Sequence, residues 1–132
     1  MAFCDEFVVV TNREYQFIAE NQLKVFQGLT WRLVLEEEAR KTTAAILLAC
    51  LEFPLSELIF IVPSDHLIQG EAYKDAINEA GILARQGGLV TFGMPVLEPE
   101  TRFGYICCDG DRVVSVAEKP DEKQAEAYQA SG

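Results

Sequence analysis

The chain has 132 residues, of which 49% are hydrophobic and 24% are charged, and its formal net charge is −10. This length and composition predict one globular domain with its own core, because two domains would need a longer chain. The acidic excess argues against nucleic acid and anionic membranes as partners, since both reward clustered Lys and Arg. A small anionic substrate would need a divalent cation or a few well-placed basic residues.

The N-terminus lacks the basic-then-apolar form of a signal peptide, and no apolar run reaches transmembrane length. The four cysteines show no metal-ligand spacing, which favours structural thiols over a disulfide or a metal site. His66 is the only histidine, so a His-rich metal site or a Ser-His-Asp triad is not expected. These features predict a cytoplasmic protein.

The first half of the chain predicts two strand–helix pairs. Residues 7–10 form a short apolar strand, and the capping-box spacing of Thr11 and Glu14 predicts a helix that ends at Gly28. A second strand over residues 32–35 leads into an acidic loop. The next helix is capped by Thr42 or Thr43, and its run over residues 44–51 is apolar on every side, which predicts a largely buried helix.

Residues 58–62 are five consecutive apolar residues followed by Pro63-Ser64-Asp65-His66. Such a run predicts a fully buried strand of a parallel sheet. Ligands of open α/β sheets sit beyond the carboxyl ends of such strands, so Asp65 is a candidate for handling a phosphate or its metal ion. The alternative is that Asp65 only caps the segment that follows.

The second half predicts a helix over residues 70–86 and a strand over residues 89–94. Strands over residues 105–108 and 113–117 flank Asp109-Gly110-Asp111, which predicts a β-hairpin. A last polar helix begins at Pro120-Asp121. The whole pattern predicts an α/β fold: one domain over residues 1–132, with a Rossmann-like, mostly parallel sheet flanked by helices and a hairpin near the C-terminus.

Four stretches in series carry a family resemblance. They are LEEEARKTTAAI (35–46), FIVPSDHLI (60–68), LVTFGMPVLEPETRFGYI (89–106) and VAEKPD (116–121). In this order and spacing the chain resembles the sugar-1-phosphate nucleotidyltransferases, and within them the bacterial mannose-1-phosphate guanylyltransferases. The similarity runs from about residue 7 to residue 132.

The resemblance implies a domain that joins a nucleoside triphosphate to a sugar 1-phosphate and releases pyrophosphate, with Mg²⁺ as cofactor. The aspartate of the family's PSDH motif, which holds the metal, falls on Asp65. Arg40 matches the arginine of the nucleotide loop. The glycine of the GYI motif falls on Gly104, and the Glu and Lys of the EKP motif fall on Glu118 and Lys119, which together imply the sugar-phosphate site.

The chain also departs from the family's pattern. The family opens with a strand and a glycine-rich basic loop that cradles the triphosphate, and no such segment precedes residue 7; beyond residue 132 the family continues into an Asn-Ser-Gly segment. We therefore expect the chain to be inactive, or nearly so, alone. We also expect the strands over 7–10 and 58–62 to pair directly, or a partner chain to fill the gap as a homo-oligomer or strand-swapped dimer.

The acidic loop differs as well. The family's Glu-Pro-x-Gly-Arg-Asn-Thr-Ala-Pro-Ala reads here EEEARKTTAA over residues 36–45. Glu36, Arg40, Thr42 and Ala45 match, but the prolines, the glycine and the asparagine are replaced, so guanine preference does not follow from this loop. Three functions remain open: part of a guanylyltransferase, a non-catalytic module for sugar-phosphate binding or oligomerisation, and a thymidylyl- or adenylyltransferase, to which PSDH with PET and GYI gives less support.

Overall fold

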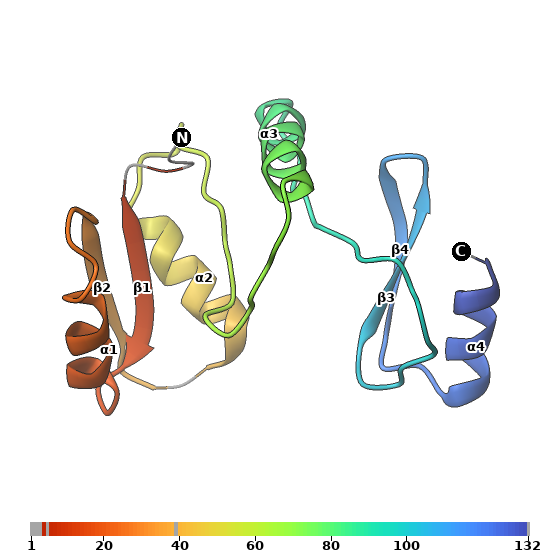
Figure 1. The fold of residues 1–132 in the computed structure, drawn as a ribbon, viewed down its shortest axis with the longest axis horizontal. Coiled ribbons are helices and arrows are strands. Elements are labelled where there is room, and N and C mark those ends of the chain that lie inside the picture. Colours follow the sequence, from red (N-terminus) through yellow and green to blue (C-terminus); the bar gives the residue numbers. More distant parts are fainter. Residues whose placement is uncertain (1–3, 5, 39, 132) are drawn as a thin grey trace. The chain divides into compact units, whose positions relative to one another are not determined.

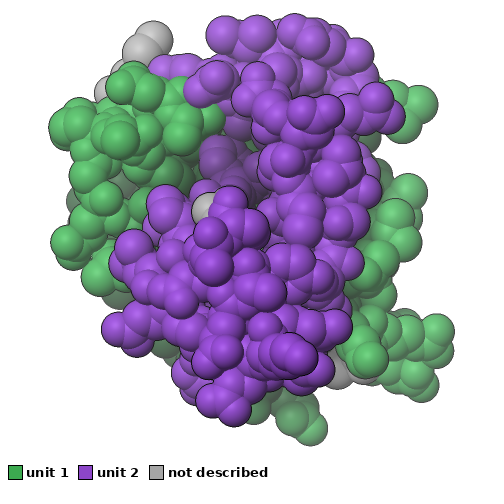
Figure 2. All heavy atoms as spheres, turned by 90° about the vertical axis from the view of Figure 1, so that its right-hand side faces the viewer, with its two compact units in different colours: residues 1–77 green, residues 78–132 purple. Residues whose placement is uncertain are grey.

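The protein was analysed as a computed structural model, which describes residues 4, 6–38 and 40–131 (Figure 1). The chain divides into two compact units, residues 1–77 and residues 78–132 (Figure 2). Each unit is described by itself below. A single domain over residues 1–132 stays a prediction. The α/β class is confirmed: a parallel strand pair with helices belongs to the first unit, and an antiparallel hairpin with a helix belongs to the second.

The first unit is built on two parallel strands, β1 (Phe7–Asn12) and β2 (Trp31–Glu36). Their register runs from Phe7 opposite Trp31 to Asn12 opposite Glu36. The Val-Val-Val run of β1 favours this extended form, because β-branched side chains suit a pleated sheet. α1 (Gln16–Leu23) connects the two strands, and in Figure 1 it lies on one side of the pair while α2 (Lys41–Leu51) lies on the other.

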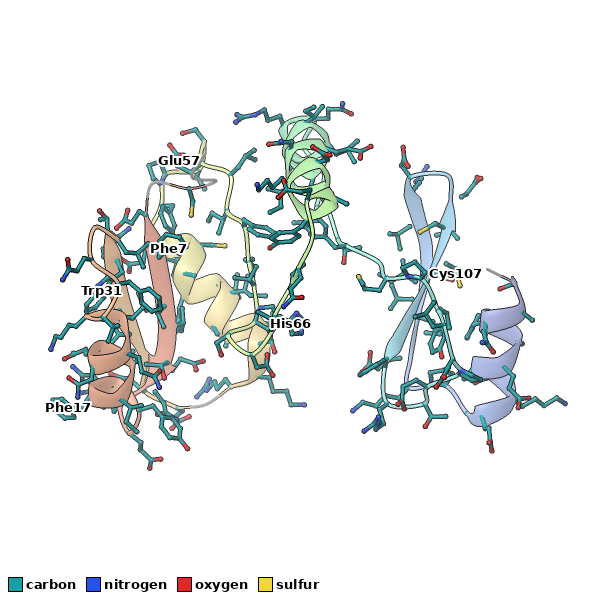
Figure 3. All side chains as sticks on the ribbon, in the orientation of Figure 1. Phe7, Phe17, Trp31, Glu57, His66 and Cys107 are labelled. Atoms are coloured by element: carbon teal, nitrogen blue, oxygen red, sulfur yellow. The ribbon has the colours of Figure 1, made fainter. Side chains whose placement is uncertain are left out.

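α1 begins later than predicted. Thr11 and Asn12 extend β1, and the Asn12 Oδ1 atom accepts a hydrogen bond from the Tyr15 backbone N–H at 3.1 Å. The turn is therefore closed by Asn12, and the predicted capping box of Thr11 and Glu14 is wrong. A short polar side chain that bonds nearby backbone competes with helix formation, so the helix starts after it. Phe17 of α1 projects away from the strands and is 71% exposed (Figure 3).

α2 corrects two expectations. It begins at Lys41, with Arg40 at the N-cap and no side-chain capping bond, so neither Thr42 nor Thr43 caps it. None of its residues is buried, and Leu51 is 80% exposed, so the prediction of a largely buried helix is wrong. The helix is apolar, as predicted, but a helix is buried only when neighbours cover every face. Here two strands contact one face of α2.

Two predicted strands are also wrong. Residues 58–62 and 89–94 belong to no strand, and four of the side chains in the first of these segments are 42–53% exposed. A strand exists only through ladder hydrogen bonds to a neighbour, which the local sequence does not supply. In the described part of the chain β1 pairs with β2 only, so direct pairing of residues 7–10 with 58–62 is also wrong. Completion of the sheet by a partner chain stays a prediction.

α3 (Ala72–Arg85) confirms the helix predicted over residues 70–86 within a few residues. Gly87, with φ at +92°, follows its end, a left-handed position that glycine takes without steric cost. At the start of α3 the Tyr73 ring contacts Phe60, with centroids 6.4 Å apart. This contact attaches the extended segment over 58–62 to the first turn of α3, which belongs to the first unit.

The second unit contains the predicted hairpin. β3 (Gly104–Asp109) and β4 (Arg112–Glu118) are antiparallel, and Gly110 turns between them with φ at +58°. α4 (Glu122–Ser131) follows as predicted. The core of this unit is small: Tyr105 is 6% exposed, Ala125 is fully buried, and the Tyr105 ring stacks on Tyr128 of α4 at a centroid distance of 5.2 Å. This stack joins the hairpin to the helix.

An arginine ties the first unit together at the end of α2. Arg32 of β2 forms ion pairs with Glu6 and with Glu52, the latter at 2.9 Å, and also donates to the Glu52 carbonyl oxygen at 3.3 Å. Its guanidinium lies 5.3 Å from the centre of the Phe53 ring, a cation–π distance. The network fixes the segment that leaves α2 against β2.

Candidate functional site

Two candidate sugar-site residues meet at one end of the hairpin. Gly104 opens β3 and pairs with Glu118, the last residue of β4. The Glu118 Oε2 atom lies only 2.9 Å from the point where a Cβ on residue 104 would stand. The carboxylate therefore lies against the glycine, and residues 14 positions apart in the sequence form one local site.

The EKPD motif turns the chain sharply after this pair. Lys119 has φ at +47°, a left-handed backbone that is uncommon for residues other than glycine. Its N–H donates to the Phe103 carbonyl oxygen at 3.1 Å, one step beyond the Gly104–Glu118 pair. Pro120 is buried, and Asp121 Oδ1 caps α4 by accepting the Gln124 N–H at 2.8 Å. The motif thus combines a candidate binding role with a structural one.

Hydrogen bonds beyond the predicted site residues hold the loop before Gly104 in place. The Glu100 N–H donates to the Tyr105 hydroxyl at 2.9 Å, and Gln129 of α4 donates to the Leu97 carbonyl oxygen at 2.7 Å. Arg102 donates to Glu100 from its backbone N–H, from Nε and from Nη2, at 2.9, 3.0 and 2.5 Å. The PET segment of the family resemblance is therefore a folded loop attached to the small core.

The ion pair between Glu100 and Arg102 is expected to break in acid. Hydrogen bonds from the Arg102 side chain and backbone lower the pKa of Glu100 from its ordinary 4.5 to about 2. Because the pKa of Glu100 is lower in the folded unit, its contact with Arg102 stabilises the fold fully above pH 4.5. This stabilisation is lost as the pH falls from 4.5 toward 2 and Glu100 takes up a proton. Carbon-detected NMR titration of the Glu100 carboxyl group measures the pKa directly.

Arg102→Gln is expected to return the Glu100 pKa toward 4.5, because the charged partner is gone. Arg112→Gln removes the same charge from the other end of the hairpin and should leave the titration unchanged. If Glu100 in the wild type titrates near 4.5, the contact between Glu100 and Arg102 is not formed as described.

The structure places Asp65 in an exposed turn after the 58–62 segment, with His66 beside it (Figure 3). A small cavity of about 260 Å³ lies next to this turn, lined by Val62, Pro63, His66, Leu67, Ile68 and Tyr73. His66 thus lines a mostly apolar hollow. Asp65 itself does not line it.

Arg40 lies at the start of α2, and its guanidinium forms an ion pair with Glu38 at 2.9 Å. It lines a cavity of about 510 Å³ between the end of β2 and α2, together with Leu35, Glu36, Glu37, Glu38, Ala44, Leu47, Leu48 and Leu51. The buried Oε1 atom of Glu36 has no hydrogen-bond partner. The cavity therefore combines an apolar wall with carboxylates and a single paired cation, a lining that disfavours a triphosphate without added positive charge.

The predicted site residues fall into separate groups. Gly104, Glu118 and Lys119 meet at the hairpin, within residues 78–132, whereas Asp65 and Arg40 belong to residues 1–77. The cavities beside the latter two share no lining residue. Among the residues that the structure places, no group of three His, Cys, Asp or Glu side chains could hold a metal.

Mg²⁺ fits this chain only in part. Magnesium is commonly held by one or two carboxylates, with substrate phosphates and water as the other ligands. Asp65 could supply one such carboxylate from its exposed turn. An ion held there would offset phosphate charge.

Comparison with known proteins identifies the lineage. The profile of the nucleotidyl transferase family, described as "Nucleotidyl transferase", matches residues 1–132. The chain belongs to this family. The resemblance read from the four motif stretches is thereby confirmed at the level of the family.

Curated relatives narrow the lineage. The chain is 37% identical to mannose-1-phosphate guanylyltransferase of Escherichia coli K12 over 98% of its length, and 34% identical to the alginate biosynthesis protein AlgA of Pseudomonas aeruginosa over 95%. It is 38% identical to the xanthan biosynthesis protein XanB of Xanthomonas campestris over 95%. The chain spans 28–30% of the length of these relatives.

No solved structure matches the chain with significance. Within the described residues, none of the helices combines the length and the apolar character needed to cross a membrane.

Proposed function

We propose that the chain provides the sugar-phosphate site and part of the nucleotide site of a mannose-1-phosphate guanylyltransferase, which converts GTP and mannose 1-phosphate to GDP-mannose and pyrophosphate. The observation that carries the proposal is the contact of the Glu118 carboxylate with Gly104 at the end of the hairpin. The 37% sequence identity with the E. coli mannose-1-phosphate guanylyltransferase supports mannose 1-phosphate as the sugar phosphate.

The proposed roles follow from the chemistry of each group. The Glu118 carboxylate would accept hydrogen bonds from sugar hydroxyls, which are strengthened by its charge. Lys119 would attract the sugar phosphate as a point charge. Gly104, because it carries no Cβ, leaves room for the Glu118 carboxylate to lie against the strand.

The nucleotide side of the reaction is assigned to the first unit. We propose that Asp65 contributes one ligand to Mg²⁺ and that Arg40 contacts the nucleotide. The reaction itself is an in-line attack of the sugar phosphate oxygen on the α-phosphorus, in which positioning and charge neutralisation lower the barrier. The protein would work in the cytoplasm, and a homo-oligomer or strand-swapped dimer would complete the edge of β1.

A second candidate is a non-catalytic module that binds a sugar phosphate or mediates assembly. The lining of the cavity beside Arg40 favours it, since the cavity is lined by three glutamates and by one cation, Arg40, which is already paired with Glu38. A nucleoside triphosphate would be repelled from such a lining.

A turnover assay separates these candidates. Pyrophosphate release is measured with GTP, mannose 1-phosphate and Mg²⁺ for the wild-type chain and for Asp65→Ala, and calorimetry follows binding of each substrate. We expect no turnover, because the cavity beside Arg40 offers a triphosphate a single cation that is already paired with Glu38, but we expect a heat of binding for mannose 1-phosphate. Turnover that disappears in Asp65→Ala would show a complete active site. Absence of heat for both substrates would reject the proposal in favour of an assembly module.

A further inference from the structure

Gly104 is unlike the other glycines of the chain. A Cβ on Gly104 would stand 2.9 Å from Glu118 Oε2 and 3.7 Å from the Ala117 carbonyl oxygen. At each of the other glycines that the structure describes, a Cβ would have no such atom within 4 Å. The space in front of Gly104 is therefore already occupied by a side chain of the protein itself.

The backbone does not explain this glycine. Several glycines of the chain have positive φ, among them Gly87 and Gly110, but Gly104 does not. It lies in an ordinary strand conformation that any residue adopts, where a glycine weakens the strand. A glycine is therefore needed at position 104 for the space that its missing Cβ leaves, and not for its backbone conformation.

We propose that Gly104 is a positioning residue, whose missing Cβ makes room for the Glu118 carboxylate and holds it at the end of the hairpin. Two features fix the backbone position of Glu118. The strand register places it directly across from Gly104, and the next residue, Lys119, has a left-handed backbone and donates its N–H to the Phe103 carbonyl oxygen. The role in ligand binding rests on the proposed function, but the steric relation of the two residues does not.

The inference predicts an unusual outcome for Gly104→Ala. The atom that a new Cβ would meet most closely is the far end of a flexible side chain, so the carboxylate moves and the backbone does not. We expect the thermal unfolding midpoint to stay at the wild-type value or to rise slightly, because alanine loses less backbone entropy on folding. The Glu118 carboxylate, however, is displaced.

The first measurement needs no ligand. The NMR chemical shift of the Glu118 carboxyl carbon is compared between the wild type, Gly104→Ala and the control Gly88→Ala, where a Cβ meets open space. A change in Gly104→Ala alone, with the fold intact, supports the inference. An unchanged Glu118 signal in Gly104→Ala overturns it. If Gly104→Ala lowers the unfolding midpoint by many degrees, the glycine is structural, and the inference is also overturned.

The second measurement is a double-mutant cycle on the dissociation constant for mannose 1-phosphate. Gly104→Ala is expected to weaken binding in the wild-type background. In the Glu118→Ala background it should change the constant by no more than about twofold, the scatter of additive pairs. Equal weakening in both backgrounds would show that Gly104 acts independently of Glu118. If the wild type does not bind the sugar phosphate, the proposed function fails while the carboxyl signal still decides the steric inference.

Discussion

Tyr105→Ala is expected to unfold most of the second unit. Tyr105 is the largest side chain of its small core: its ring stacks on Tyr128, and its hydroxyl accepts the Glu100 N–H at 2.9 Å. Truncation of a buried aromatic residue costs about 3–5 kcal/mol. A unit of this size has little stability in reserve, so most molecules should lose the hairpin and α4.

Two matched variants locate the source of this effect. Tyr105→Phe keeps the ring and removes only the hydroxyl acceptor, so a loss of about 1 kcal/mol is expected. Phe103→Ala removes an aromatic side chain that is 65% exposed, two residues away, and should cost much less than Tyr105→Ala. Circular dichroism and hydrogen exchange of the α4 amides measure both. A Tyr105→Ala protein with wild-type exchange protection in α4 would contradict the role assigned to this core.

Glu118→Gln is expected to weaken binding of mannose 1-phosphate by about tenfold or more. The substitution keeps the shape that fits against Gly104, but removes the negative charge that strengthens hydrogen bonds from sugar hydroxyls, a contribution of about 1.5–3 kcal/mol. The fold should be unaffected, because Glu118 ends a strand and is exposed. Isothermal calorimetry gives the dissociation constant.

Glu126→Gln is the control for charge, since it makes the same substitution at an exposed position of α4 in the same unit. It should leave the dissociation constant at the wild-type value. Equal weakening by Glu126→Gln and Glu118→Gln would mean that net charge, rather than a contact at Glu118, governs binding.

Elements stabilised by local interactions were predictable from the sequence. The hairpin around Asp109-Gly110-Asp111 and the helix after Pro120-Asp121 both depend on turn and cap residues a few positions away, and both are confirmed. The strand predictions for residues 58–62 and 89–94 are wrong for the opposite reason, because a parallel strand needs hydrogen bonds to a neighbour that is distant in the sequence. Asn12 shows that local signals also compete, since it closes a turn where Thr11 predicted a helix cap.

The candidate site, like the fold, could be predicted from the sequence only in part. The motif order placed Gly104 and Glu118 in one site, and the strand register brings them into contact. The roles of Tyr105 and Glu100 in fixing the loop could not be read from the motifs, because a hydroxyl acceptor and a two-residue salt bridge leave no periodic pattern. Asp65 and Arg40 keep their assignments as proposals.

The sugar-phosphate site is tested most directly by titrating the ¹⁵N-labelled chain with mannose 1-phosphate and following the amide NMR shifts. We expect saturable changes at Gly104, Glu118 and Lys119, whose backbone groups converge at one end of the hairpin. These changes should be absent in Glu118→Ala. Saturable changes elsewhere with none at these three amides, or no change at millimolar ligand, would contradict the assignment of the sugar-phosphate site.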